Sequence, residues 1–203
     1  MNRQQIRAKV KGLLNRNDCT DELANDFINM AQTRIERTLR SPGQERISVS
    51  TGNALTVEDE IIIPEDFLSL KHMYSGDVLL SNKDLGHFLG LPKESGQPRY
   101  YCRVAGSYLM KPAVPLGTSV YMIYYGAQPA LVNDTDTNLF TTVLADLLIY
   151  CALAFAADYF VDDRVTGFET KYEILYAEVE EQSRLTDTDQ STQAMEPAYG
   201  SEY

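Results

Sequence analysis

The sequence has few of the residues on which enzyme active sites are usually built. Its 203 residues include two histidines, His72 and His87, and three cysteines, Cys19, Cys102 and Cys151. The cysteines lie far apart, are odd in number and form no CxxC or Cys/His spacing, which indicates reduced thiols in a cytosolic setting. A G-x-S-x-G elbow and a phosphate-binding glycine loop are both missing. We therefore expect no catalytic residues, no metal site and no cofactor.

Two weaker catalytic alternatives stay open at this stage. Cys102 and His72 could form a nucleophilic dyad, although both fall in strand-like runs where side chains usually pack or face solvent. The cluster of Asp158, Asp162 and Asp163 could bind a hard cation. Its spacing does not match an EF-hand loop, and helix capping and solvation explain it better.

The charge is strongly acidic and unevenly distributed. Eighteen basic and 29 acidic residues give a net charge of −11, which disfavours wrapping duplex DNA or docking on an anionic membrane as the main function. Residues 1–17 carry basic residues and no acid, whereas acids dominate from Asp158 onward. This asymmetry could join the two ends of one chain, or the end of one subunit to the start of its neighbour. Two separately solvated faces are the alternative.

The most apolar stretch, "LADLLIYCALAFAADYFVDD" at 144–163, is expected to be a packed helix and not a membrane span. Asp146 lies one turn into the run and Asp158 closes it, and carboxylates are costly in a bilayer. Thr142, Asp146 and Tyr150 recur every fourth residue and give the helix one narrow polar stripe. The basic N-terminus lacks the unbroken apolar run of a signal peptide, so we expect no export.

Periodicity divides the chain into helical ends around a β-rich centre. Apolar residues at helical spacing predict two helices, with Asp18 or Thr20 as caps of the second: Ile6, Val10, Leu13 and Leu14, then Leu23, Phe27, Met30, Ala31, Ile35 and Leu39. Residues 46–130 predict five to seven antiparallel strands, with glycine hairpin turns in "YSGDV" and "VAGSY" and a short helical turn in "KDLGHFLG".

Helical patterns return after residue 130. One long apolar helix is expected over about 139–160, and "TGFE" at 166–169 has the capping-box spacing that would open another. That second helix has an apolar stripe of Phe168, Tyr172, Leu175 and Val179. After Arg184 the sequence is polar and aperiodic, so that alone it should be disordered.

These patterns predict an α+β fold in which N- and C-terminal helices form one core and an antiparallel β region is inserted between them. The expected segments are a helical hairpin at 1–45, the β-rich insertion at 46–130, core-completing helices at 131–186 and a flexible tail at 187–203.

Taken in order, several segments resemble the head-to-tail adaptor, or connector, proteins of tailed bacteriophages. "FINMAQTRIERTLRSP" is similar to the family's second helix, in which an apolar stripe alternates with Arg. "IIIPEDFLSLKHMYSGDVLL" resembles its pattern of an apolar run, Pro, a small or acidic residue, Asp and Phe, then a strand. "GQPRYYCRVAGSYLMKPAV" is similar to its Gly-x-Pro, aromatic strand and hairpin.

The later segments continue the resemblance. "VYMIYYGAQPALVNDTDTNLF" resembles a strand with paired tyrosines and a loop into the main helix. "LLIYCALAFAADYFVDDRVTGFETKYEILYAEVE" is similar to an Ala-rich helix, an Asp-Asp-Arg joint and a final helix with an aromatic residue near its start. The similarity covers most of the chain as an ordered series of modest motifs.

The resemblance implies a structural virion protein at the head–tail junction, assembled in the host cytoplasm. Such adaptors form a ring, usually twelve-fold, beneath the portal protein. They extend the DNA channel without specific DNA binding and provide the platform for the tail or neck protein. They are not enzymes, and no membrane is involved.

The resemblance also implies contact residues. In family members the C-terminal end reaches the portal, so the expected portal anchors are Met195, Tyr199 and Tyr203. Between ring subunits, the basic first helix is expected to contact the acidic last helix of a neighbour. The residues of this expected contact are Arg3, Arg7, Lys9 and Lys11 on the first helix, and Glu173, Glu180 and Glu181 on the last.

Two other classes of function remain as alternatives. The strand tyrosines Tyr100, Tyr101, Tyr121, Tyr124 and Tyr125 could build a tail-associated module that binds carbohydrate or another ligand. An enzyme using Cys102 or the Asp cluster is the third class.

Overall fold

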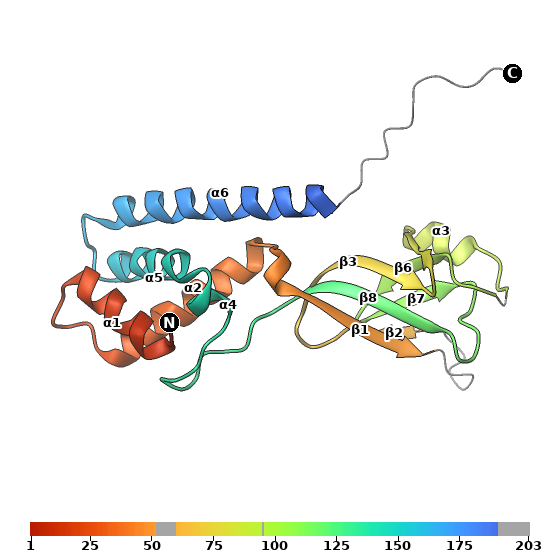
Figure 1. Cartoon of the computed structure of the whole chain (residues 1–203), viewed down its shortest axis with the longest axis horizontal. Helices are drawn as coiled ribbons and strands as arrows, with labels where there is room; N and C mark the ends of the chain where they lie inside the picture. The colour runs from red at the N-terminus through yellow and green to blue at the C-terminus, as the bar shows by residue number, and fades with distance from the viewer. Residues whose placement is uncertain (52–59, 95, 191–203) are drawn as a thin grey trace, which may run out of the picture. The chain divides into compact units, whose positions relative to one another are not determined.

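The computed structural model describes residues 1–51, 60–94 and 96–190 (Figure 1). The chain divides into two compact units. We call Met1–Pro42 with Leu131–Tyr203 the helical unit, and Gly43–Ala130 the β unit. Helices and strands are segregated as the sequence predicts, so the α+β class is confirmed.

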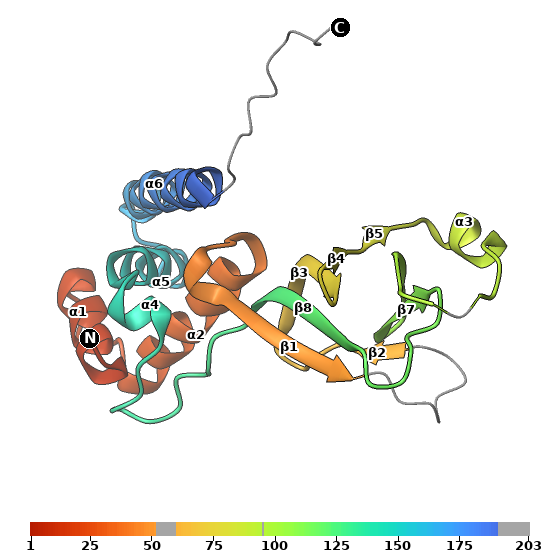
Figure 2. The same cartoon turned by 45° about the vertical axis from the view of Figure 1, so that its right-hand side comes forward.

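The helical unit is built around one central helix. Its elements are α1 (Arg3–Leu14), α2 (Asp21–Thr38), α4 (Leu139–Thr142), α5 (Ala145–Tyr159) and α6 (Val165–Gln190). The 3-10 turn η1 (Pro42–Gln44) follows α2 and leads into the β unit. α5 contacts α1, α2, α4 and α6. Figures 1 and 2 both show α6 along one side of α5, with α1 and α2 on the other.

α5 is apolar on nearly every side because both of its flanks are covered. Nine of its residues are buried, Leu147, Leu148, Ile149, Cys151, Ala152, Leu153, Ala154, Ala156 and Ala157. Its alanines let neighbouring helices approach closely, as ridges-into-grooves packing requires. Among the described residues, no helix has both the length and the apolar character needed to cross a membrane.

The first two helices begin where side chains satisfy their free amides. Asn2 caps α1 in a capping box with Gln5. The Leu23 amide donates to the Thr20 hydroxyl at 3.2 Å, so Thr20 and not Asp18 caps α2. Most of the predicted stripes are buried, but Leu13 and Met30 are 46% and 48% exposed.

The expected long helix at 139–160 is in fact two helices. α4 ends at Thr142 and α5 begins at Ala145. The hydroxyls of Thr141 and Thr142 both donate to the Asn138 carbonyl, at 3.0 and 2.8 Å. Such hydroxyl contacts compete with the helical ladder, and the β-branched run Thr-Thr-Val has low helix propensity.

The joint between α5 and α6 is a Schellman motif. The Asp162 amide donates to the Ala157 carbonyl at 2.8 Å, and the Val161 amide donates to the Asp158 carbonyl at 3.1 Å. This motif requires a left-handed residue, usually glycine, and here Val161 occupies it with φ 52°. Its side chain is 90% exposed.

α6 begins at Val165, so the predicted capping box at 166–169 is wrong. Asp162 holds the turn that leads into α6, because its carboxylate accepts from the Arg164 amide at 3.0 Å and from the Arg164 guanidinium at 2.6 Å. These bonds hold the pKa of Asp162 well below its usual range. A carboxylate before the helix also opposes the helix dipole.

α6 runs on to Gln190, beyond Arg184, where the sequence turns polar and aperiodic. The described part of the chain therefore holds a helix over the first residues of the expected tail at 187–203. The rest of that tail, from 191, lies outside the described residues.

The β unit consists of two four-stranded sheets. The first has the order β1 (Glu45–Thr51), β8 (Ser119–Gly126), β3 (Phe67–Ser75), β4 (Val78–Leu79); the second has the order β2 (Glu60–Ile62), β7 (Ser107–Lys111), β6 (Tyr100–Val104), β5 (Ser81–Asn82). We call them the first and second sheets. The described strands number eight rather than the expected five to seven, and β5 pairs with β6 in parallel.

The two sheets share one core, and the short helix α3 (Leu85–Gly90) follows β5. Met73, Met122 and Tyr124 come from the first sheet, and Tyr108 and Met110 come from the second. The hairpin turn in "YSGDV" uses Gly76 at φ 55°, as predicted. In "VAGSY" the positive φ falls on Ala105, at 50°, and not on Gly106.

The segment "PEDF" at 64–67 ties the first sheet together. The Tyr124 hydroxyl donates to Asp66 at 3.0 Å, and the Arg46 guanidinium pairs with Asp66 at 2.9 Å. The Phe67 ring stacks on Tyr124 with centroids 5.6 Å apart. Arg46 also lies against Gly126, where any Cβ would clash with its side chain.

An ion pair between α2 and α6 was not predicted from the sequence. The Arg34 guanidinium donates to both carboxylate oxygens of Glu169, one of them at 3.1 Å, and lies 4.4 Å from the ring centre of Tyr172. Both charged side chains are largely covered, and the pair raises the pKa of Arg34. Desolvation raises the pKa of Tyr172 to about 12.

We expect Val161→Gly to stabilise the chain by about 1 kcal/mol. Glycine removes a left-handed strain of about 1–2 kcal/mol but adds unfolded-state entropy of about 0.5–1 kcal/mol. The exposed Val161 side chain loses little packing. Urea unfolding followed by circular dichroism at 222 nm measures the difference. Val161→Ala should fall between the two chains, and a Val161→Gly chain less stable than the parent would contradict the strain.

We expect Arg34→Met to destabilise the helical unit by about 1–3 kcal/mol, because it leaves the half-covered Glu169 carboxylate without its partner. The matched control is Arg37→Met, which removes an exposed arginine from the same helix and should change stability by less than about 0.5 kcal/mol. Equal effects of the two substitutions in urea unfolding would show that the pair contributes nothing.

Candidate assembly surfaces

The basic residues of α1 mostly hold the helical unit together. Arg3 is 9% exposed and donates to the Val132 carbonyl. Arg7 makes two bonds to the Asp134 carboxylate, at 2.7 and 3.0 Å. These contacts attach α1 to the loop that re-enters the helical unit after the β unit. They also raise the pKa of Arg7 and lower that of Asp134.

Lys11 and Lys9 differ in their surroundings. The Lys11 ammonium lies 2.6 Å from Asp21 at the start of α2 and lowers the pKa of that carboxyl. Lys9 is exposed and makes no ion pair with any residue that the structure describes. Of the four predicted basic contact residues, Lys9 is therefore the one whose charge faces solvent.

The predicted acidic contact residues all lie on the exposed side of α6. Glu173 and Glu180 are exposed, and Glu181 pairs with Arg184 at 2.7 Å. The predicted portal anchors Met195, Tyr199 and Tyr203 lie outside the described residues.

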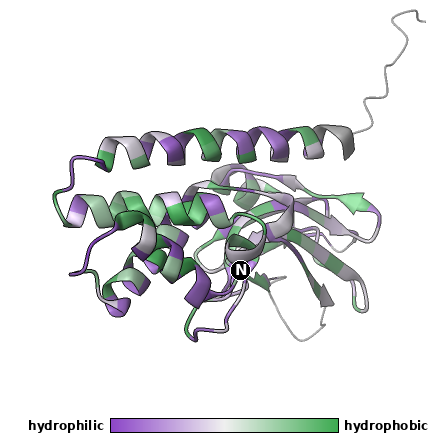
Figure 3. Cartoon of the chain, turned by 60° about the vertical axis from the view of Figure 1, so that its left-hand side comes forward, coloured by the Kyte–Doolittle hydropathy of each residue, from purple (hydrophilic) through white to green (hydrophobic). Residues whose placement is uncertain are grey.

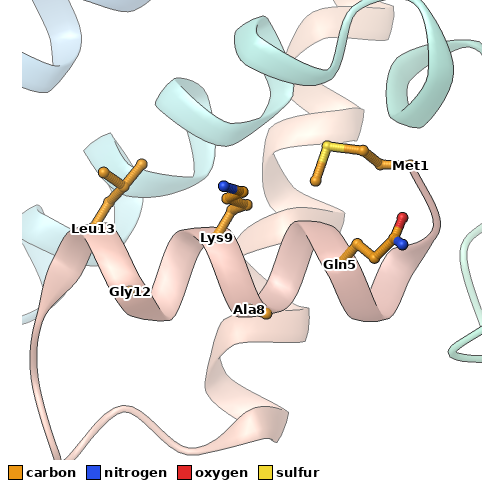
Figure 4. Close-up of a pocket in the computed structure, with 6 residues that line it drawn as sticks. All are labelled: Met1, Gln5, Ala8, Lys9, Gly12 and Leu13. Atoms are coloured by element: carbon orange, nitrogen blue, oxygen red, sulfur yellow. The ribbon is translucent and has the colours of Figure 1, made fainter.

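The outer face of α1 is a shallow depression that the other described helices of its unit leave open. It is lined by Met1, Gln5, Ala8, Lys9, Gly12 and Leu13 (Figure 4). The long apolar side chains stand at its ends, with the small residues Ala8 and Gly12 between. Lys9 is the lysine among the residues that line this depression.

α6 has a similar outer face. Its inner face carries the predicted stripe, which packs on the core as expected. The outer face is lined by Ile174, Ala177, Glu178, Glu181, Gln182 and Leu185. Ile174 and Leu185 are 54% and 51% exposed. Hydrophilic and hydrophobic turns alternate along this helix in Figure 3.

The outer face of the first sheet is also apolar. Val49 of β1 lies opposite Tyr121 of β8, and Tyr121 lies opposite Tyr74 of β3. Ile47 of β1 lies opposite Ile123 of β8. Ile47 and Val49 are 68% and 54% exposed. An apolar patch across three strands is typical of a protein-contact surface.

The residues considered for catalysis do not form a site. Cys102 is buried in the second sheet, where desolvation raises the pKa of its thiol, whereas His72 is exposed on β3 of the first sheet. The Asp162 carboxylate is occupied by Arg164. Within the described ranges, no group of three or more His, Cys, Asp or Glu residues is placed to hold a metal ion.

We expect Asp134→Asn to lower the melting temperature by about 1–2 °C at pH 7, because it removes an exposed but bidentate partner of Arg7. The folded pKa of Asp134 is lowered, so its contribution is complete above the unfolded pKa of about 3.9 and is lost as the pH falls through the folded value. The difference between variant and parent should therefore disappear in acid. Asp26→Asn, at an exposed position of α2, is the control, and a difference that does not shrink as the pH falls below the unfolded pKa would contradict the assignment.

Comparison with known proteins identifies one family. No curated protein matches the chain. The profile of one family, described as SU10 adaptor protein, matches residues 1–198 and so includes both units. The chain therefore belongs to the SU10 adaptor protein family, a family of phage head-to-tail adaptors.

Proposed function

We propose that this protein forms a homo-oligomeric ring, twelve-fold as is usual for such adaptors, beneath the portal protein of a tailed phage. The ring extends the DNA channel and provides the platform on which the downstream tail or neck protein docks. It acts at the head–tail junction of the virion after assembly in the host cytoplasm. No membrane and no cofactor take part.

The observation that carries the proposal is the family match over residues 1–198. It spans both units as far as residue 198 and includes one of the three predicted portal anchors, Met195. The family is one of structural adaptors and not of enzymes. The exposed apolar faces of α1, α6 and the first sheet add the protein-contact area that an assembly component needs.

DNA is proposed to pass through the ring without specific binding. The net charge of −11 repels phosphate. A repulsive lining would let the duplex slide where a basic groove would hold it through counterion release.

The tail is proposed to anchor the ring on the portal. Met195, Tyr199 and Tyr203 would fill apolar pockets between portal subunits. Side chains of this kind often dominate an interface, at about 2 kcal/mol or more each when truncated.

The carbohydrate-binding alternative gains little from the positions of the tyrosines. Tyr124 and Tyr125 are buried, and Tyr101 packs edge-on against Tyr108 at 5.6 Å in the core between the sheets. Desolvation raises the pKa of Tyr101 accordingly. Tyr121 is 39% exposed, so Tyr121→Ala, and not Tyr101→Ala, is the variant that would test glycan binding without disturbing the core.

The function is tested by native mass spectrometry of the chain mixed with the assembled portal ring of its own phage. We expect the full chain to add in a stoichiometry that matches the portal. A chain ending at Gln190, which keeps α6 intact, should lose most of this binding. A full chain that fails to bind a correctly assembled portal would overturn the proposal.

The anchors are tested separately from the length of the tail. The triple variant Met195→Ala, Tyr199→Ala, Tyr203→Ala should weaken portal binding at least about 100-fold. The matched control, Ser191→Ala, Thr192→Ala, Gln193→Ala, changes the same number of tail positions and should bind like the parent. Equal binding by both variants would remove the anchor assignment and leave the adaptor function standing.

A further inference from the structure

Within the described helical unit, α1 and α6 each have an outer face that the other helices of the unit leave exposed, and these two faces cannot meet within one chain. The inner faces of α1 and α6 both pack on α5, on its opposite sides. Their outer faces, defined above, therefore point away from that core; Figure 4 shows the residues that line the face of α1. Arg164, which directly precedes α6, donates to the carbonyl of Leu14, the last residue of α1, at 2.7 Å.

The two faces match in layout. Each has exposed aliphatic side chains at its ends, Met1 and Leu13 on α1 and Ile174 and Leu185 on α6. Each also has a small residue near its centre. Small residues let two helix axes approach to the 8–10 Å at which ridges fit into grooves.

The charged residues on the two outer faces determine which pairs of faces can pack together. Two α6 faces brought together would oppose Glu178 and Glu181 to their own copies, and two α1 faces would oppose Lys9 to Lys9. Like charges in one interface are strongly disfavoured. Unlike faces place Lys9 against Glu178 and Glu181, with aliphatic residues on both sides of the pair.

We propose that the outer face of α6 in one copy packs against the outer face of α1 in the next copy. Because the two faces differ, the contact is heterologous and generates a ring or an open chain, whereas a self-complementary face would stop at a dimer. This inference rests on the proposed ring function and identifies the surfaces that build the ring.

The proposed contact uses fewer basic residues than the contact predicted from the sequence. Arg3, Arg7 and Lys11 are used within the helical unit, and Lys9 takes over as the basic partner. On α6, Glu178 is added, and Glu181 is retained although it also pairs with Arg184 on the same helix, because both acids line the outer face together with the aliphatic residues.

Cross-linking between full chains of different mass tests the geometry. Ala8 and Ala177 are exposed at the centres of the two faces, and the native thiols Cys19, Cys102 and Cys151 are buried. A short bis-maleimide should join an Ala8→Cys chain to an Ala177→Cys chain on the assembled portal. Neither variant should cross-link to itself, and Ala8→Cys mixed with Lys93→Cys is the matched negative control. The chain with both substitutions should give a ladder of covalent oligomers.

Charge reversal tests the same contact without cysteines. Lys9→Glu should raise the concentration at which the ring half-assembles by about tenfold, because attraction becomes repulsion. Lys93→Glu reverses an exposed lysine of the β unit and should have no effect. Adding Glu178→Lys to Lys9→Glu should restore assembly, a recovery that a misfolded variant would not show.

The outcomes separate this inference from the proposed function. If parent chains gather on the portal but Ala8→Cys and Ala177→Cys chains do not cross-link, or each cross-links to itself, the interface is wrong and the adaptor function stands. If parent chains do not gather on the portal, the proposed function is wrong. If chains free in solution then also give no cross-link, the proposed interface is wrong as well.

Discussion

The fold depends on the burial of α5. A helix that is apolar on nearly every side must be covered on both flanks, and no single neighbour can do so. α1 and α2 cover one flank and α6 covers the other, although the whole β unit, Gly43–Ala130, lies between the two groups in the sequence. The intervening residues form a unit with its own core, so the helical unit can close without them.

Polar contacts then fix how the separated segments meet. Arg34 and Glu169 join α2 to α6, and Arg7 and Asp134 join α1 to the loop that returns from the β unit. In the β unit, the Asp66 carboxylate joins the segment before β3 to β1 through Arg46 and to β8 through Tyr124. The "PEDF" segment that contributes to the family resemblance is therefore explained by packing and hydrogen bonding, with no need for a catalytic role.

The sequence predicts elements well where one face alone is buried, and less well where the outcome depends on long-range contacts. The periodicity of α2 and of the inner face of α6 is confirmed, and so is the packed nature of α5. Leu13 fitted the stripe of α1 by spacing, but its position on the outer face depends on where α5 lies. The break at Val143 and the turn held by Asp162 follow from local hydrogen bonds, which periodicity does not register. The number of basic residues predicted a basic α1. Only the structure shows that Arg3, Arg7 and Lys11 make contacts within the helical unit and that the charge of Lys9 faces solvent.

The Schellman turn at Val161 has a consequence in genetic terms. A valine codon becomes a glycine codon by one change at its second base, the shortest step that would relax this left-handed residue. Such a step would leave the core untouched, because what it deletes is a side chain that is almost wholly in solvent. Variants with glycine at position 161 are thus a single mutation away. Sequencing phage populations around codon 161 would show whether selection on the assembled particle removes these variants.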